Sequence, residues 1–191
     1  MDTIFLITIL VVIFALAFDF INGFHDTANA IATSVSTRAL KPRVAVLMAA
    51  IMNFVGALTF VGVAKAIASN IVDPMSLNAF EGDVTGSVVI LAALCSAITW
   101  NLLTWYYGIP SSSSHTLIGS LAGAAIGAAG FSILNYDGFL NILAALIISP
   151  ILALTVGFIV MSLFKIFFRN LGLYKTNSRF RLVQILTAAV Q

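Results

Sequence analysis

The amino-acid sequence predicts an all-α, polytopic helical membrane protein. Hydrophobic residues make up 61% of the 191 residues and charged residues only 8%, against about 25% charged residues in soluble domains. Several apolar runs approach the roughly 20 residues that a helix needs to cross the hydrocarbon core, and none shows the ten-residue alternation of a membrane β-strand. Cys95 is the single cysteine, which excludes an intramolecular disulfide.

The apolar runs divide the chain into spans with one interruption at membrane depth. The first run is longer than one perpendicular crossing, and Gly23 near its middle is an expected break; a later run is interrupted by GIPSSSSHT at residues 108–116. We expect a transmembrane region over residues 1–181, with spans at about 4–39, 44–68 and 139–168, a hairpin at 88–130 and a basic loop at 165–181. Residues 182–191 are expected to begin a further, incomplete transmembrane helix.

The distribution of charge predicts the topology. Basic residues gather in two clusters, Arg38, Lys41 and Arg43, and Lys165, Arg169, Lys175, Arg179 and Arg181. The positive-inside rule places both clusters in the cytoplasm, and their position beside apolar spans argues against nucleic-acid binding. An acidic outer loop between them then requires an odd number of crossings, which three full crossings or a re-entrant hairpin plus one crossing would both satisfy. Four serines and a histidine are costly against lipid, which favours the hairpin, with the N-terminus outside.

A polar stripe lies within the first span. Polar side chains recur there at intervals of three and four residues, at Asp19, Asn22, Asp26, Asn29, Thr33 and Ser36, and therefore share one face of a helix. A carboxylate at mid-bilayer costs roughly 2.5 to 3.5 kcal/mol, and such groups usually face a cavity or bundle interior. Interhelical hydrogen bonding would explain the amides and hydroxyls but not the two carboxylates. Carboxylate and amide oxygens are hard ligands, so the stripe indicates a cation site.

The interruption at residues 108–116 forms a second candidate site. Proline followed by serines is typical of a helix start, and a half-helix beginning here would direct N–H groups, hydroxyls and its positive dipole end into the membrane. An anion site is favoured over an exposed serine-rich turn. A Ser/His/Asp hydrolase is a weak alternative, because adjacent Ser114 and His115 point in different directions on a helix and no nucleophile elbow accompanies them.

Two segments carry a resemblance to a known family. GFHDTANAIATSVSTRAL, residues 23–40, resembles the signature of the inorganic phosphate transporter (PiT) family, and WNLLTWYYGIPSSSSHTLIG, residues 100–119, resembles its re-entrant segment. The resemblance implies a secondary transporter with two inverted repeats, each contributing one acidic motif and one hairpin, and residues 1–181 would be the first transmembrane repeat. Asp26 and Asn29 match the motif residues implicated in cation coordination, while His25 stands where the motif usually has Asn. Residues 112–116 match the hairpin tip that holds phosphate.

The sequence thus predicts a cation-coupled phosphate transporter, not an enzyme, with Na⁺ or H⁺ as coupling ion and no cofactor. The expected phosphate ligands are Ser112, Ser113, Ser114, His115 and Thr116, and the expected cation ligands are Asp26, Asn29, Asn22 and Asp19, with Na⁺ at Asp26 and Asn29. Family members are nearly twice as long, so the chain is expected to be an N-terminal half that meets a second repeat, a partner chain or a second copy. Phosphate alone or as a metal-phosphate complex, and the lipids of the cell membrane, are the expected partners. A sulfate permease and a non-transporting assembly subunit are the alternatives.

Overall fold

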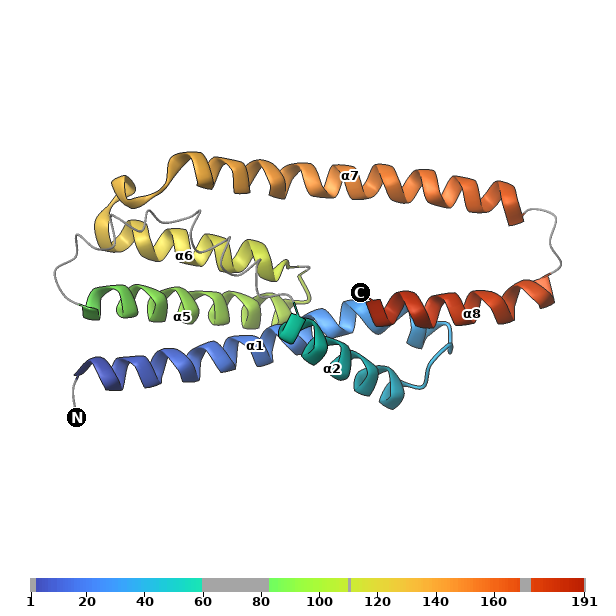
Figure 1. Ribbon diagram of the computed structural model, residues 1–191, viewed down its shortest axis with the longest axis horizontal. Helices are drawn as coiled ribbons and strands as arrows, with labels where there is room; N and C mark the ends of the chain where they lie inside the picture. Colours follow the sequence, from blue (N-terminus) through green and yellow to red (C-terminus); the bar gives the residue numbers. More distant parts are fainter. Residues whose placement is uncertain (1–2, 60–82, 110, 169–172, 191) are drawn as a thin grey trace. The chain divides into compact units, whose positions relative to one another are not determined.

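The computed structural model describes residues 3–59, 83–109, 111–168 and 173–190 (Figure 1). Its elements are all helices: α1 (Thr3–Ser36), α2 (Pro42–Thr59), α5 (Asp83–Tyr107), α6 (Ser113–Ala129), the short 3₁₀ helix η1 (Phe131–Ile133), α7 (Tyr136–Phe168) and α8 (Leu173–Val190). Four of the described helices have apolar stretches long enough to cross a membrane: Thr3–Ser36, Pro42–Thr59, Gly86–Tyr107 and Tyr136–Phe167. The predicted all-helical membrane class is confirmed.

Two details differ from the sequence-based expectation. Helix α1 continues without interruption through Gly23, because one glycine in a helix costs only about 1 kcal/mol relative to alanine and a long apolar helix tolerates it. Helix α8 begins at Leu173, within the segment expected to be a basic loop, and its lysine and arginines are good helix formers. The expected end of the second span at residue 68 and the acidic loop lie outside the described residues.

The chain divides into two compact units, of which the first comprises residues 1–26 and 61–143. In this unit the N-terminal part of α1 packs on α5 through Phe18, Leu94 and Ala97, and partly buried side chains extend the contact at Val11, Phe14, Ala15, Ile98 and Leu117. Helices α5 and α6 lie side by side (Figure 1) and bury small residues such as Ala97 and Ala125. Small side chains allow the two helix backbones to approach closely.

The turn between α5 and α6 positions the first turn of α6. Helix α5 ends in a Schellman motif, in which Ile109 N–H donates to the Thr104 carbonyl at 2.8 Å and Gly108 N–H donates to the Trp105 carbonyl at 3.2 Å. Gly108 has a φ of 64°, the left-handed conformation that this motif requires. Ser112, in an extended conformation, is the N-cap of α6.

Gly108→Ala is expected to lower the stability of the first unit. Open space surrounds the position of an added Cβ, so the penalty of about 1–2 kcal/mol comes from the left-handed backbone alone. Thermal unfolding in detergent should show a lower Tm. The matched control is Gly123→Ala, which also adds a Cβ into open space but within helix α6. An equal loss of Tm in both variants would contradict the role given to the turn.

The second unit comprises residues 27–60 and 144–191. Its core contains Ile31, Ala45 and Ala49, so the C-terminal part of α1 packs on α2. Helix α8 is joined to the end of α1 mainly through Gln184. The Gln184 side chain donates to the Thr33 carbonyl at 3.3 Å and accepts from the Thr37 hydroxyl at 3.0 Å.

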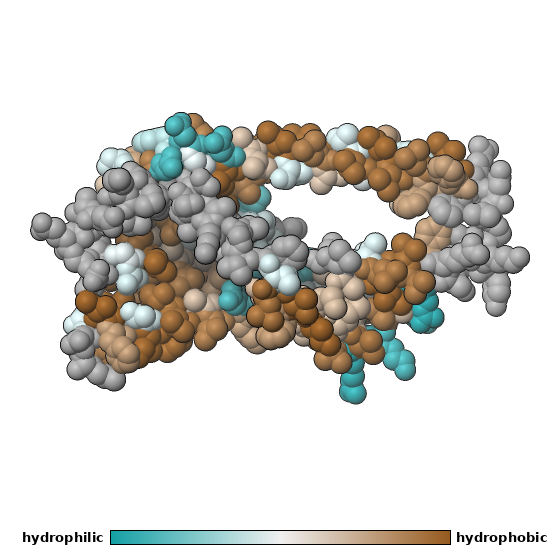
Figure 2. Space-filling view, viewed as in Figure 1, coloured by the Kyte–Doolittle hydropathy of each residue, from teal (hydrophilic) through white to brown (hydrophobic). Residues whose placement is uncertain are grey.

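Helix α7 presents an almost uninterrupted apolar surface. Leu154 is 76% exposed and Phe158 is 74% exposed, and Figure 2 shows hydrophobic residues along this helix. Such a surface would be costly in water but is ordinary in lipid or against other membrane helices. The chain is a multi-pass membrane protein.

Candidate functional site: an acidic helix and a hairpin tip

Helix α1 carries three of the predicted cation ligands into the first unit. Asp19 and Asp26 are exposed, whereas Asn22 is half-buried. The Asn22 Oδ1 atom is buried and accepts no hydrogen bond. The three residues follow one another at helical spacing, so Asp19 lies about 10 Å along the helix axis from Asp26.

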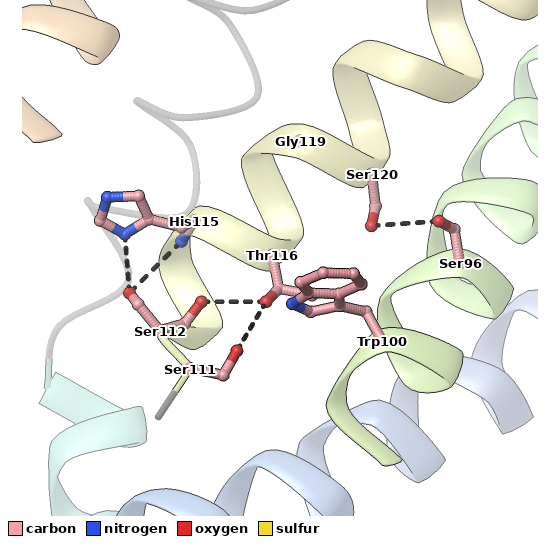
Figure 3. Close-up of a pocket in the computed structure, with 8 residues that line it drawn as sticks. All are labelled: Ser96, Trp100, Ser111, Ser112, His115, Thr116, Gly119 and Ser120. Atoms are coloured by element: carbon pink, nitrogen blue, oxygen red, sulfur yellow. Dashed lines mark hydrogen bonds between the residues drawn. The ribbon is translucent and has the colours of Figure 1, made fainter. Parts of the chain in front are cut away.

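The hairpin tip is organised by hydrogen bonds around Ser112. The Ser112 Oγ accepts from the His115 N–H at 3.5 Å, and it lies 2.8 Å from His115 Nδ1 (Figure 3). The buried Thr116 donates its hydroxyl to the Ser112 carbonyl at 3.0 Å and lies 3.4 Å from the Ser111 hydroxyl. These bonds hold the first turn of α6 in a single arrangement, with its N–H groups and positive dipole end at the tip.

One hydrogen bond joins the acidic helix to the hairpin tip. Ser113 donates its hydroxyl to Asp26 Oδ2 at 2.8 Å, across 87 residues of sequence. An edge-to-face contact between Phe24 and Trp105, with ring centroids 5.8 Å apart, packs the same region of α1 against α5. The motif expected to bind a cation and the motif expected to bind an anion are therefore in direct contact.

A pocket of about 580 Å³ lies between α5 and α6 beside the tip. Its described lining consists of Ser96, Trp100, Ser111, Ser112, His115, Thr116, Gly119 and Ser120 (Figure 3). Hydroxyls extend the polar lining away from the tip, where Ser120 donates to Ser96 at 3.4 Å. The predicted residues Ser112, His115 and Thr116 are thus brought together in one cavity.

Sequence reasoning missed Ser96, Trp100 and Ser120 as lining residues. A signal was present, because Ser112, Thr116 and Ser120 recur every four residues and so share one face of α6. Ser96 and Trp100 have the same spacing on α5. Which faces of the two helices meet depends on their packing, which spacing alone does not reveal.

The structure does not gather all the predicted ligands. Asn29 lies on α1 but belongs to the second unit, and Ser114 is exposed next to Ser113. Among the described residues, no group of three or more His, Cys, Asp or Glu side chains is placed to hold a metal ion.

This chain is similar to known proteins of one family. Residues 22–190 match the model of the Phosphate transporter family. A probable low-affinity inorganic phosphate transporter of Bacillus subtilis is 65% identical over 191 residues, which are 100% of this chain and 56% of that protein. The low-affinity inorganic phosphate transporter PitA of Escherichia coli is 43% identical over 156 residues, covering 78% of this chain and 31% of that protein.

A solved structure is also similar to this chain. It is described as "The sodium-dependent phosphate transporter", with 30% identity and a TM-score of 0.77 over 84% of this chain and 39% of that one. The chain spans about half the length of the Bacillus subtilis relative. On the match to residues 22–190 and on these relatives, the chain belongs to the phosphate transporter family.

Proposed function

We propose that this chain forms the cation-binding and anion-binding half of a secondary transporter that moves inorganic phosphate together with Na⁺. Its family and the names of its relatives support phosphate as the substrate. The name of the similar solved structure supports Na⁺ over H⁺ as the coupling ion. The observation that carries the proposal is the hydrogen bond from Ser113 to Asp26.

This hydrogen bond suggests how the two ions are coupled. A serine hydroxyl has one hydrogen to donate, and in this structure Ser113 gives it to Asp26 Oδ2. A cation at Asp26 would neutralise the carboxylate and compete for its oxygens. The Ser113 hydroxyl would then be free to turn toward a phosphate at the N-terminus of α6.

Electrostatic repulsion between Asp26 and phosphate would also make phosphate binding depend on the cation. A phosphate that accepted the Ser113 hydrogen would lie about 5 Å from the Asp26 carboxylate, given hydrogen-bond lengths of about 2.8 Å. At an effective dielectric constant of about 20, two unit charges at that distance repel by about 3 kcal/mol, or roughly a hundredfold in affinity. Bound Na⁺ removes this penalty, and by linkage bound phosphate tightens Na⁺ binding equally.

The anion would be held by neutral donors. The first turn of α6 offers backbone N–H groups and the positive end of the helix dipole, a combination that favours tetrahedral oxyanions. Ser112, His115 and Thr116 surround that end and line the adjoining pocket. Ser114, which is exposed on the same turn, would add a further hydroxyl donor to the anion.

The proposal includes a place in the membrane. The chain would lie in the cell membrane with its N-terminus outside, with α5 and α6 forming a re-entrant hairpin. The chain would be the first of two inverted repeats, and the second repeat would supply the rest of the site. Whether that repeat comes from the same gene product or from a partner chain does not alter the roles of Asp26 and Ser113.

Uptake of radiolabelled phosphate into proteoliposomes containing the full gene product tests the proposal. Uptake should require an inward Na⁺ gradient, cease when choline replaces Na⁺, and continue in the presence of a protonophore. Excess unlabelled phosphate should compete, and excess sulfate should not. Uptake driven by a pH gradient without Na⁺ would overturn the choice of Na⁺, and equal competition by sulfate would overturn the choice of phosphate.

A further inference from the structure

Two buried amide groups near the site lack hydrogen-bond partners. Asn101 on α5 is only 1% exposed, and its Nδ2 atom has no acceptor. In Asn22 on α1 the buried Oδ1 atom, an acceptor, receives no hydrogen bond. A buried polar atom without a partner costs roughly 1–3 kcal/mol, so two such atoms in one small unit call for an explanation.

Contacts before and after these two residues set the alignment of α1 against α5. Before them, Phe18 of α1 packs in one cluster with Leu94 and Ala97 of α5. After them, Phe24 of α1 contacts Trp105 of α5, with ring centroids 5.8 Å apart. The two helices therefore advance in parallel.

The register between the helices follows from these contacts. Asn22 lies one turn after Phe18 and Asn101 lies one turn after Ala97, so each asparagine extends the stripe that forms the contact. From this register we infer that the buried donor and the buried acceptor lie at about the same level along the two helices.

We propose that Asn22 and Asn101 form an interhelical amide pair that positions Asp26 against Ser113. Asn101 Nδ2 would donate to Asn22 Oδ1. The χ2 torsion of asparagine is broad, so the amides can turn toward each other at small cost. The pair would satisfy both buried atoms with a single hydrogen bond.

The location of the pair explains why it would matter for ion binding. Asn22 lies one turn before Asp26 on α1, and Asn101 lies in the last two turns of α5 before the Gly108 turn that leads to Ser113. A link at this level fixes the sliding and rotation of α1 against the hairpin. It therefore sets the distance between the Asp26 carboxylate and the Ser113 hydroxyl, 2.8 Å between Oδ2 and Oγ here. This role rests on the proposed function, whereas the pairing itself does not.

Chemical cross-linking tests the pairing independently of transport. In a Cys95→Ala background of the full gene product, Asn22→Cys with Asn101→Cys should be joined by the short bifunctional thiol reagent dibromobimane, with the appearance of its fluorescence. The control combines Asn101→Cys with Phe20→Cys, because Phe20 is 74% exposed on another face of α1. Absence of cross-linking at 22 and 101, or equal cross-linking in the control, would overturn the pair.

A double-mutant cycle tests the positioning role. Asn22→Leu and Asn101→Leu keep the branched shape of the side chain but remove the hydrogen bond, and each should raise the half-saturating Na⁺ concentration for phosphate uptake about tenfold. The double variant should have the same half-saturating Na⁺ concentration as the more affected single variant, because either substitution alone already removes the hydrogen bond. Fold-changes that multiply, or a lowered Tm with unchanged Na⁺ dependence, would overturn the role.

The two tests distinguish a failure of the amide pair from a failure of the proposed function. If the unmodified gene product takes up no phosphate while residues 22 and 101 cross-link, the proposed function fails and the amide pair stands. If uptake is Na⁺-dependent but the cysteines do not cross-link, the amide pair fails and the proposed function stands.

Discussion

Asp26→Asn is expected to abolish the dependence of phosphate binding on Na⁺. The amide keeps the size of the side chain but has no charge, so it binds Na⁺ weakly and no longer repels phosphate from the tip of α6. Since the repulsion is worth about 3 kcal/mol, the roughly hundredfold increase in phosphate affinity that Na⁺ produces should fall to near unity. Phosphate binding to purified protein, measured by calorimetry with and without Na⁺, gives this ratio directly.

The matched comparison for Asp26 is Asp19→Asn. Asp19 is also an exposed carboxylate on α1, but it lies about 10 Å further toward the N-terminus, and the hydroxyl of Ser113 is bonded to Asp26. Its replacement should leave most of the Na⁺ effect in place. Unaltered Na⁺-coupled binding and uptake in Asp26→Asn would remove Asp26 from the cation site.

Ser113→Ala is the substitution with the second largest expected effect. It removes the hydrogen that alternates between Asp26 and the anion in the proposed mechanism. A hydrogen bond to a charged group contributes about 1.5–3 kcal/mol, so the Kd for phosphate in the presence of Na⁺ should rise roughly 10- to 100-fold. Without Na⁺ the loss should be smaller, because Asp26 already occupies the hydroxyl in that state. The same calorimetric titrations measure both values.

Ser114→Ala is the control for Ser113→Ala. It distinguishes the loss of a hydrogen-bond donor to phosphate from the loss of coupling between phosphate and Na⁺. Ser114 is the next residue of the same helical turn and is exposed. Its loss can weaken phosphate binding, but by an equal factor with and without Na⁺. Ser113→Thr, which retains the hydroxyl, should restore much of the Na⁺ dependence. An equal fold-change for Ser113→Ala at both Na⁺ concentrations would contradict the alternating hydrogen bond.

Helical class and motif content could be predicted because they depend on local sequence. The apolar runs identified all four candidate spans, and the serines after Gly108 marked the break between α5 and α6. The extent of α8 was not predicted, because basic residues suit both a cytoplasmic loop and a helix. Its position depends on Gln184, whose side chain bonds to residues more than one hundred positions earlier.

The sequence by itself determined that a charged stripe and a hydroxyl-rich break lie within apolar helices, since charge, spacing and hydropathy are properties of single segments. Only the tertiary structure decided that Ser113, among four consecutive serines, faces Asp26, and that Phe18 of α1 packs against Leu94 and Ala97 of α5. The reason is that a helix turns about 100° per residue, so neighbouring side chains point to different surroundings. Which one meets a partner is set by the register between helices that are far apart in the sequence.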